Sequence, residues 1–151
     1  MTLSATVVIT TKNRKDELRA AIESALTQSA KPEVLVIDDG STDSTSEMVR
    51  ADYPSVVLHR SDTSAGYIAQ RNRGAELANG EVIFSIDDDA AFSSPRVIEQ
   101  TLGEFRHPRI AAVAIPFINV KKDDVLRQQA PRAAADSPTS TPPARPPTAE
   151  L

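Results

Sequence analysis

The chain has 151 residues, 40% of them hydrophobic, and a formal net charge of −4 from 17 Lys and Arg against 21 Asp and Glu. This length suits one compact domain, and the acidic balance without a long basic run argues against nucleic acid as a partner. The absence of cysteine excludes disulfides, thiolate metal sites and a cysteine nucleophile. No apolar run approaches the roughly 20 residues of a transmembrane segment, and the N-terminus lacks a basic leader. We therefore expect a cytoplasmic protein that can also attach peripherally to a membrane.

Short apolar runs alternate with helical patterns from the N-terminus onward. The β-branched run Val7–Ile9 predicts a first strand. Apolar residues at helical spacing then predict a helix from residue 13 to about residue 28, with Asn13 as its N-terminal cap. The continuous apolar run Val34–Ile37 is typical of a parallel strand covered on both faces, and it ends at Asp38.

The same alternation continues through the middle of the chain. Ser44 and Glu47 have the spacing of a capping box and predict a short second helix. Residues 56–58 predict the next strand, and residues 67–78 predict a third helix. The dipeptide Asn79-Gly80 suits a left-handed cap at the end of that helix.

The last predicted elements surround a run of three aspartates. Residues 82–86 predict the most buried strand, and Asp87–Asp89 follow it directly. Ser94-Pro95 is a strong start for a fourth helix, and residues 110–115 predict a final strand. The sequence leaves the oligomeric state open, although a free sheet edge near Val113 is a place where a partner strand can pair.

Strands that alternate with helices predict an α/β fold with a doubly wound, mostly parallel sheet. Ligands of such sheets bind beyond the carboxyl ends of the strands. The polar segments 10–13, 38–43 and 87–89 all follow predicted strands, so we expect them to converge in one crevice. Beyond about residue 120 the sequence becomes rich in Pro, Ala, Ser and Thr, which predicts a disordered tail from about residue 130.

The aspartate run carries the clearest chemistry. Asp87 and Asp89 place two carboxylates at alternate positions after a buried strand, an arrangement that suits Mg²⁺ or Mn²⁺ held partly by substrate phosphates. A solvated acidic turn is the alternative interpretation of this run.

Other polar side chains allow a nucleotide interpretation, each with a plainer alternative. Asp38 or Asp39 could accept the imide N–H of uracil or thymine, whereas residues 41–43 suit an Asx turn and a helix cap. Arg71 or Arg73 could pair with a diphosphate, although solvation is the usual role of a single surface arginine.

Four segments together resemble the N-terminal half of family 2 glycosyltransferases with the GT-A fold. They are V-V-I-T-T-K-N-R, V-I-D-D-G-S-T-D, Q-R-N-R-G-A-E-L-A-N-G-E and F-S-I-D-D-D, and the resemblance covers about residues 5–120. It implies transfer of a sugar from a nucleoside diphosphate donor of the UDP or dTDP type, usually with inversion. It also implies Mg²⁺ or Mn²⁺ between the donor phosphates and the aspartates.

The resemblance also assigns roles by position. It implies that Thr10 and Thr11 line the base pocket and that Arg73 lies near the phosphates. It implies that Asp39 contacts the base with Asp38 beside it, that Asp87 meets the ribose and that Asp89 binds the metal. The predicted donor site comprises Thr10, Thr11, Asn13, Asp38, Asp39, Arg73, Asp87 and Asp88, and the predicted metal ligands are Asp89 and Asp87.

The chain departs from the family pattern in two places. Thr10-Thr11-Lys12 stands where Pro-Thr-Tyr is commoner, so an aromatic contact to the base is lost at Lys12. The acceptor half with its general base is expected to be missing, which leaves the catalytic residue unknown and the saccharide or lipid acceptor unidentified. We therefore expect residues 1–120 to form the nucleotide-sugar-binding domain and residues 121–151 to form a linker and tail.

Three functional hypotheses follow. The first is a metal-dependent glycosyltransferase, and the second is a catalytically incomplete module or remnant that binds a nucleotide sugar. The third is a doubly wound domain that binds another phosphorylated ligand or none. A dinucleotide-binding domain is disfavoured because no G-x-G-x-x-G follows the first strand.

Overall fold

The computed structural model describes residues 3–107, 109–118 and 128–129. It divides the chain into two compact units, Met1–Ala111 and Ala112–Leu151. In the second unit, β5 (Phe117–Ile118) and β6 (Gln128–Gln129) form an antiparallel pair. The tail predicted from about residue 130 lies outside the described residues.

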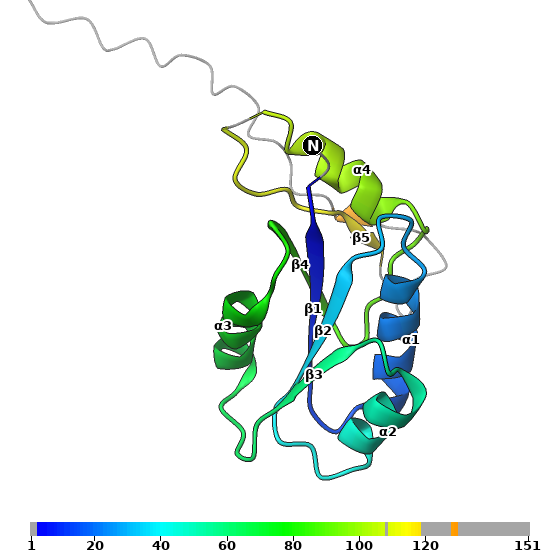
Figure 1. The fold of residues 1–151 in the computed structure, drawn as a ribbon, viewed down its shortest axis with the longest axis vertical. Coiled ribbons are helices and arrows are strands. Elements are labelled where there is room, and N and C mark those ends of the chain that lie inside the picture. The colour runs from blue at the N-terminus through cyan, green and yellow to red at the C-terminus, as the bar shows by residue number, and fades with distance from the viewer. Residues whose placement is uncertain (1–2, 108, 119–127, 130–151) are drawn as a thin grey trace, which may run out of the picture. The chain divides into compact units, whose positions relative to one another are not determined.

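The first unit is built on a four-stranded sheet (Figure 1). Across the sheet the strands are β3 (Val57–Arg60), β2 (Glu33–Asp38), β1 (Ala5–Thr11) and β4 (Val82–Asp87). Every neighbouring pair is parallel. This arrangement confirms the predicted α/β fold with a parallel sheet.

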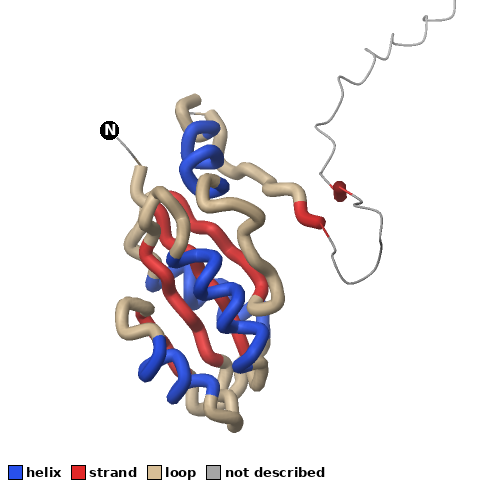
Figure 2. The backbone as a smooth tube through the Cα atoms, turned by 90° about the vertical axis from the view of Figure 1, so that its right-hand side faces the viewer, coloured by secondary structure: helices blue, strands red, loops and turns tan. Residues whose placement is uncertain are grey.

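Helices cover both faces of this sheet. The helices are α1 (Lys15–Leu26), α2 (Thr45–Asp52), α3 (Tyr67–Leu77) and α4 (Val97–Glu104). Helix α3 lies on one face, and α1 and α2 lie on the other (Figures 1 and 2). Among the described residues no helix has the length and apolar character needed to cross a membrane.

The core is concentrated on β1 and β2, whose apolar side chains alternate between the two faces. Val7 and Ile9 pack in the larger apolar cluster with Leu18 of α1, whereas Val8 and Ile37 pack in a second cluster on the opposite face. All four sheet residues are at most 1% exposed. Covering both faces in this way explains why these strands are continuous apolar runs in the sequence.

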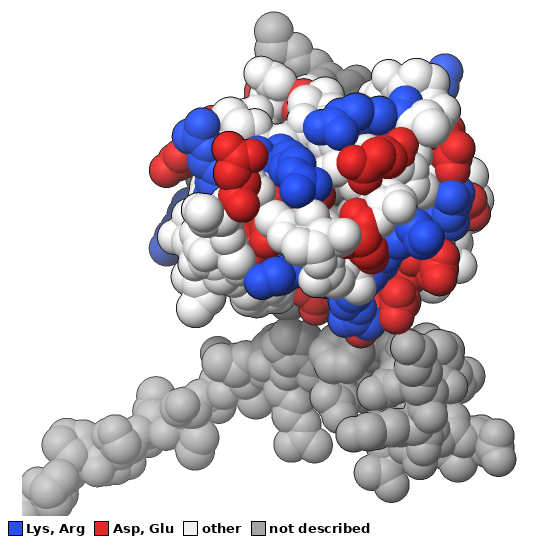
Figure 3. Space-filling view, turned by 90° about the horizontal axis from the view of Figure 1, so that it is seen from below, with Lys and Arg blue, Asp and Glu red and all other residues white. Residues whose placement is uncertain are grey.

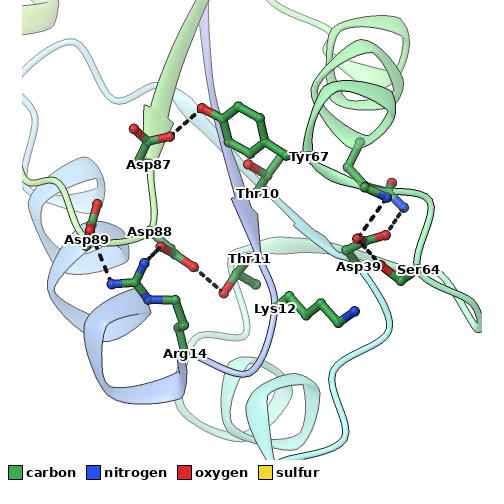
Figure 4. A pocket seen from close by; sticks show the side chains of 12 residues that line it. Thr10, Thr11, Lys12, Arg14, Asp39, Ser64, Tyr67, Asp87, Asp88 and Asp89 are labelled. Carbon is green, nitrogen blue, oxygen red and sulfur yellow. Dashed lines mark hydrogen bonds and ion pairs between the residues drawn. The ribbon is translucent and has the colours of Figure 1, made fainter.

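Gly74 allows α3 to lie close to the sheet. A Cβ built on Gly74 would overlap the side chain of Val8 and would lie 3.3 Å from Cγ1 of Ile37. The absence of a side chain at this position therefore fixes how near the helix approaches β1 and β2. This approach places Tyr67 and Gln70, one turn or more earlier in the helix, beside the carboxyl ends of the strands (Figure 4).

The prediction that residues 82–86 form the most buried strand is wrong. Only Phe84 is buried in β4, and Ile83 is 42% exposed. Helix α3 packs mainly on β1 and β2, so it leaves that face of β4 uncovered. Among the described strands β4 is also an edge strand with a single neighbour.

The predicted strand at residues 110–115 is also absent. Residues 110–116 have no regular structure, and β5 begins only at Phe117. A strand requires a neighbour to receive its backbone hydrogen bonds, and none of the described strands pairs with this segment. Pro116 also lacks the N–H that a ladder needs.

Two helix starts differ from the predicted caps. Asn13 has a positive φ of 53° and is not the cap, because α1 begins at Lys15 with Arg14 in the N-cap position. The capping box of Ser44 and Glu47 is not formed either. The N-cap Ser44 makes no side-chain capping hydrogen bond, and the N–H of Thr45 donates to Oδ1 of Asp43 at 3.1 Å.

The ends of the later helices are determined by tertiary contacts. Asn79-Gly80 does not form a left-handed cap, because α3 ends at Ala78 in an extended conformation. Gly80 is instead required by close approach, since its Cβ would lie 2.5 Å from the backbone carbonyl carbon of Ala5. At the start of α4, Oε1 of the buried Gln28 accepts the N–H of Ile98 at 3.1 Å.

We expect Gly74→Ala to lower the free energy of unfolding by up to about 2 kcal/mol. The overlap with Val8 costs about 1–3 kcal/mol, and the gain of about 1 kcal/mol from higher helix propensity offsets part of this cost. Gly103→Ala is the matched control, because the nearest atom to its Cβ belongs to the flexible Arg106 at 3.7 Å. Urea denaturation followed by circular dichroism should show Gly103→Ala as neutral or stabilising. Equal effects of the two substitutions would contradict this packing.

Candidate functional site

A pocket of about 550 Å³ lies at the carboxyl ends of the strands (Figure 4). Its walls come from the segments after β1, β2 and β4 and from the start of α3. The predicted convergence of the polar segments is therefore present. The lining residues are Thr10, Thr11, Lys12, Arg14, Asp39, Ser64, Gly66, Tyr67, Gln70, Asp87, Asp88 and Asp89.

Asp39, at the end of β2, organises the wall formed by the loop before α3. Its Oδ1 accepts hydrogen bonds from Ala65 N and Gln70 Nε2, both at 2.7 Å. Its Oδ2 accepts from Ser64 Oγ at 2.6 Å and from Gly66 N at 3.1 Å. Burial alone would raise the pKa of Asp39, but these four donors outweigh it and lower the pKa to about 2. Asp39 therefore remains ionised at neutral pH and fixes the loop.

Asp38 and Asn13 lie beside the pocket and hold the turn after β2. Asp38 is completely buried and accepts from Ser41 N at 2.9 Å and from Ser46 Oγ. Asn13 accepts the N–H of Thr42 at 2.7 Å and donates its own N–H to Ser41 Oγ at 2.9 Å. Neither side chain lines the pocket, so their contribution to it is through the shape of the turn.

Thr10 and Thr11 end β1 on opposite faces of the sheet. Thr11 Oγ1 donates to Oδ2 of Asp88 at 2.8 Å and so connects β1 to the aspartate run. Thr10 is only 7% exposed, and its Oγ1 has no hydrogen-bond partner among the described residues. A buried hydroxyl without a partner is costly, and Thr10 lines the pocket, so a bound ligand could satisfy it.

Asp87, the first of the three aspartates, is paired with the start of α3. Its Oδ1 accepts from Tyr67 Oη at 2.7 Å and from Arg71 Nη2 at 2.6 Å. The guanidinium of Arg71 also stacks over the Tyr67 ring, 4.2 Å from its centroid. Burial together with the adjacent Asp87 raises the pKa of Tyr67, which therefore stays protonated and can donate.

Asp88 and Asp89 share one cation, Arg14. Arg14 Nη1 lies 3.4 Å from Oδ1 of Asp88, and its Nη2 lies 3.2 Å from Oδ2 of Asp89 (Figure 4). Asp88 is 7% exposed, and its burial raises its pKa although Thr11 and Arg14 act in the opposite direction. The side chain of Asp89 is 43% exposed and faces solvent at the rim.

The pocket lining and the predicted site residues differ in both directions. Six residues line the pocket without having been predicted: Lys12, Arg14, Ser64, Gly66, Tyr67 and Gln70. Three predicted residues do not line it: Asn13, Asp38 and Arg73. Arg14 and Gln70 were missed, although both belong to motif segments that follow predicted strands or open a predicted helix. Arg73 does not line the pocket and pairs with Glu76 at 3.1 Å. Arg71, two positions earlier, is the arginine of α3 that reaches the aspartates.

The side chains that line the pocket carry a net negative charge. Its lining contains four carboxylates and only two cationic side chains, Lys12 and Arg14. Viewed from the carboxyl ends of the strands, acidic and basic side chains are interspersed on the surface (Figure 3). An anionic ligand would therefore enter this pocket more favourably together with a cation.

The aspartates fit a divalent ion that brings other ligands with it. Among the described residues, no group of three or more His, Cys, Asp or Glu side chains is arranged to hold a metal ion by itself. Mg²⁺, however, commonly binds through one or two carboxylates and completes its shell with water and substrate phosphates. Asp87 and Asp89, 52% and 43% exposed, supply oxygen ligands of this kind.

Comparisons with known proteins agree with this geometry. A family model described as "Glycosyl transferase family 2" matches residues 6–148, a span that includes most of the predicted tail. The chain is 38% identical over 88 residues to the uncharacterized glycosyltransferase YibD of Escherichia coli (strain K12), which covers 55% of this chain and 25% of that protein. It is 31% identical over 110 residues to a glucosyl-dolichyl phosphate glucuronosyltransferase of Haloferax volcanii, which covers 71% and 35% of the two chains. The chain thus spans about a quarter to a third of the length of these relatives.

Solved structures show the same fold. The mannosyltransferase PcManGT from Pyrobaculum calidifontis, in complex with GDP-Man and Mn²⁺, superposes with a TM-score of 0.65 at 23% identity. The match covers 72% of this chain and 34% of PcManGT. TarS 1-349 of S. aureus in complex with UDP-GlcNAc gives a TM-score of 0.58 at 24% identity, over 67% of this chain and 30% of TarS 1-349.

We expect Asp39→Asn to lower the free energy of unfolding by about 2 kcal/mol at pH 7, since one pKa unit corresponds to about 1.4 kcal/mol. The pKa of Asp39 falls from 3.8 to about 2 on folding. A carboxyl lowered in this way stabilises the folded state above its ordinary pKa, and that contribution disappears as the pH falls through the folded-state value. The difference between wild type and variant should therefore shrink between about pH 4 and pH 2.

Urea denaturation at pH 7 and near pH 3 checks this expectation. Asp62→Asn is the control, because Asp62 is exposed and lies outside the pocket lining. A loss of stability at Asp39→Asn that does not depend on pH would show that the carboxylate charge is not what holds the loop.

Proposed function

The chain belongs to glycosyltransferase family 2, and on this premise we propose that its pocket binds a nucleoside diphosphate sugar together with Mg²⁺ or Mn²⁺. The observation that carries the proposal is the acidic pocket at the strand ends, where Asp87 ends β4 and Asp88 and Asp89 follow it. A diphosphate carries negative charge and would be repelled by these carboxylates unless a divalent cation bound with it. PcManGT, which shares the fold, is in complex with GDP-Man and Mn²⁺.

Individual roles within the donor site follow from the contacts. We assign Asp89 and Asp87 as the carboxylates that hold the metal, because both are exposed at the rim. Bound there, a divalent ion would neutralise charge that develops on the departing diphosphate. We assign Arg71 rather than Arg73 to the phosphates, because Arg71 lies beside Asp87 and its Nε is buried without a partner among the described residues.

We assign the base to the wall of the pocket that Asp39 and its loop form, and the ribose, as the family resemblance implies, to Asp87. Thr10, whose hydroxyl has no partner among the described residues, lines the same pocket as Asp39. Because the oxygens of Asp39 already accept four hydrogen bonds, a base that contacts Asp39 must replace one of these donors. Asp38 and Asn13 shape the adjoining turn. We propose a UDP- or dTDP-type donor and test GDP beside it, since the neighbouring structures contain both UDP-GlcNAc and GDP-Man.

Sugar transfer also needs a base that removes the proton of the acceptor hydroxyl. Each carboxylate that lines the pocket already has a hydrogen-bond or ion-pair partner: Asp39 with the loop, Asp87 with α3, and Asp88 and Asp89 with Arg14. Among the described residues, the pocket lining therefore supplies no carboxylate without a partner for this step. This favours a second candidate function, a module that binds the nucleotide sugar without turnover.

Calorimetric titration tests the donor site directly. UDP, dTDP and GDP are titrated into the chain with Mn²⁺ and again with EDTA. We expect binding of at least one nucleotide with Mn²⁺ and a loss of at least about tenfold in affinity in EDTA, because the carboxylates then repel the diphosphate. Asp89→Asn should give the same loss in Mn²⁺, and Asp62→Asn should bind as the wild type does.

The outcomes separate the hypotheses. Failure of a folded chain to bind any of the three nucleotides would contradict the proposed function. Binding that is equal in Mn²⁺ and EDTA would instead favour a site for another phosphorylated ligand. Release of free sugar from a bound donor would support the transferase over the binding module.

A further inference from the structure

Arg14 occupies a position that its own helix disfavours. It is the N-cap residue of α1, and its side chain makes no capping hydrogen bond. The N-terminal end of a helix carries partial positive charge, so a cation there is destabilising. Asp16 and Glu17 in the first turn are the charges that this helix end prefers. The location of Arg14 is therefore explained by its acidic partners and not by the stability of α1.

Those partners include two of the three aspartates, and the two are bound very differently. Asp88 is buried, and both of its oxygens are engaged, Oδ2 by Thr11 and Oδ1 by Arg14. Asp89 has only one partner among the described residues, the Arg14 guanidinium at 3.2 Å, and its side chain is 43% exposed. Arg14 itself is 39% exposed, so its contact with Asp89 is the one that can be exchanged.

We propose that Arg14 is an internal counter-ion of the aspartate run that makes metal binding depend on the nucleotide. The inference rests on the proposed function. Without a nucleotide, Arg14 neutralises Asp89 and repels a second cation from the rim. With a nucleotide, the phosphates supply further metal ligands and negative charge. A divalent ion can then bind Asp89, while Arg14 keeps its contact with Asp88.

Electrostatics determines the size of the expected effect. Two like unit charges about 4 Å apart repel each other by about 1 kcal/mol even in water. The repulsion between the Arg14 guanidinium and a divalent ion at that distance would be twice as large, and salt reduces it. Removing the charge of Arg14 should therefore raise the affinity for the metal alone by about fivefold. When the nucleotide is bound, its phosphates offset the charge of Arg14, so the affinity for the metal should then change little. The factor by which the nucleotide improves metal binding should therefore fall in proportion.

The test measures Mn²⁺ binding by electron paramagnetic resonance, with the metal alone and with the nucleotide that binds most tightly. Arg14→Gln and Arg14→Ala remove the charge, and Arg14→Lys keeps it. Arg19→Gln is the matched control, because Arg19 lies on the same helix, is 41% exposed and pairs with Asp52 away from the pocket. Circular dichroism establishes that each variant is folded.

We expect wild type, Arg14→Lys and Arg19→Gln to bind Mn²⁺ weakly without nucleotide and more tightly with it. Arg14→Gln and Arg14→Ala should bind Mn²⁺ alone about fivefold more tightly and should show a correspondingly smaller gain from the nucleotide. If both neutral variants bind Mn²⁺ alone no more tightly than the wild type does, the inference is overturned. The proposed function still stands in that case, provided that the wild type binds Mn²⁺ more tightly with nucleotide. Absence of Mn²⁺ binding by the wild type even with nucleotide would overturn both.

Discussion

The pocket depends on the parallel pairing of β1 with a neighbour on each side. In this register Thr11 lies opposite Asp38, and Thr10 lies opposite Asp87. Because all these strands point the same way, the polar residue that ends each one is delivered to the same edge of the sheet. The close approach of α3 at Gly74 then adds a fourth wall. Segments far apart in the chain thus form one site.

The carboxylates of this site are held in two different ways. Asp39 is surrounded by neutral donors, two of them backbone amides, which fix its position and keep it ionised. The three aspartates at the end of β4 are held by two arginines, Arg14 at the start of α1 and Arg71 of α3, and two of the three remain exposed. A carboxylate fixed by neutral donors organises protein structure, whereas an exposed carboxylate paired with an exchangeable cation can accept a different cation.

The sequence predicted the sheet and the location of the site better than the details of either. Strands β1 and β2 were predictable because both faces are covered, which leaves an uninterrupted apolar run. The exposure of β4 was not predictable from the sequence, because it depends on which strands α3 packs against. Asn13 was expected to cap α1 but binds the turn after β2, a contact made only in the folded chain. The pairing of Arg14 with the aspartates was hidden for the same reason, because adjacent charges in a sequence do not reveal a partner more than 70 residues away.

The proposed function depends on the binding of a divalent ion, together with a nucleoside diphosphate, at Asp87–Asp89. Paramagnetic broadening of backbone amide signals by substoichiometric Mn²⁺, recorded on the labelled chain with UDP or GDP, tests it most directly. We predict the strongest broadening at Asp87–Asp89 and Thr11, with little effect at Asn79 and Gly80, which precede β4 at the opposite end of the sheet. Broadening that is absent in the presence of nucleotide, or concentrated away from the strand ends, would contradict the proposed function.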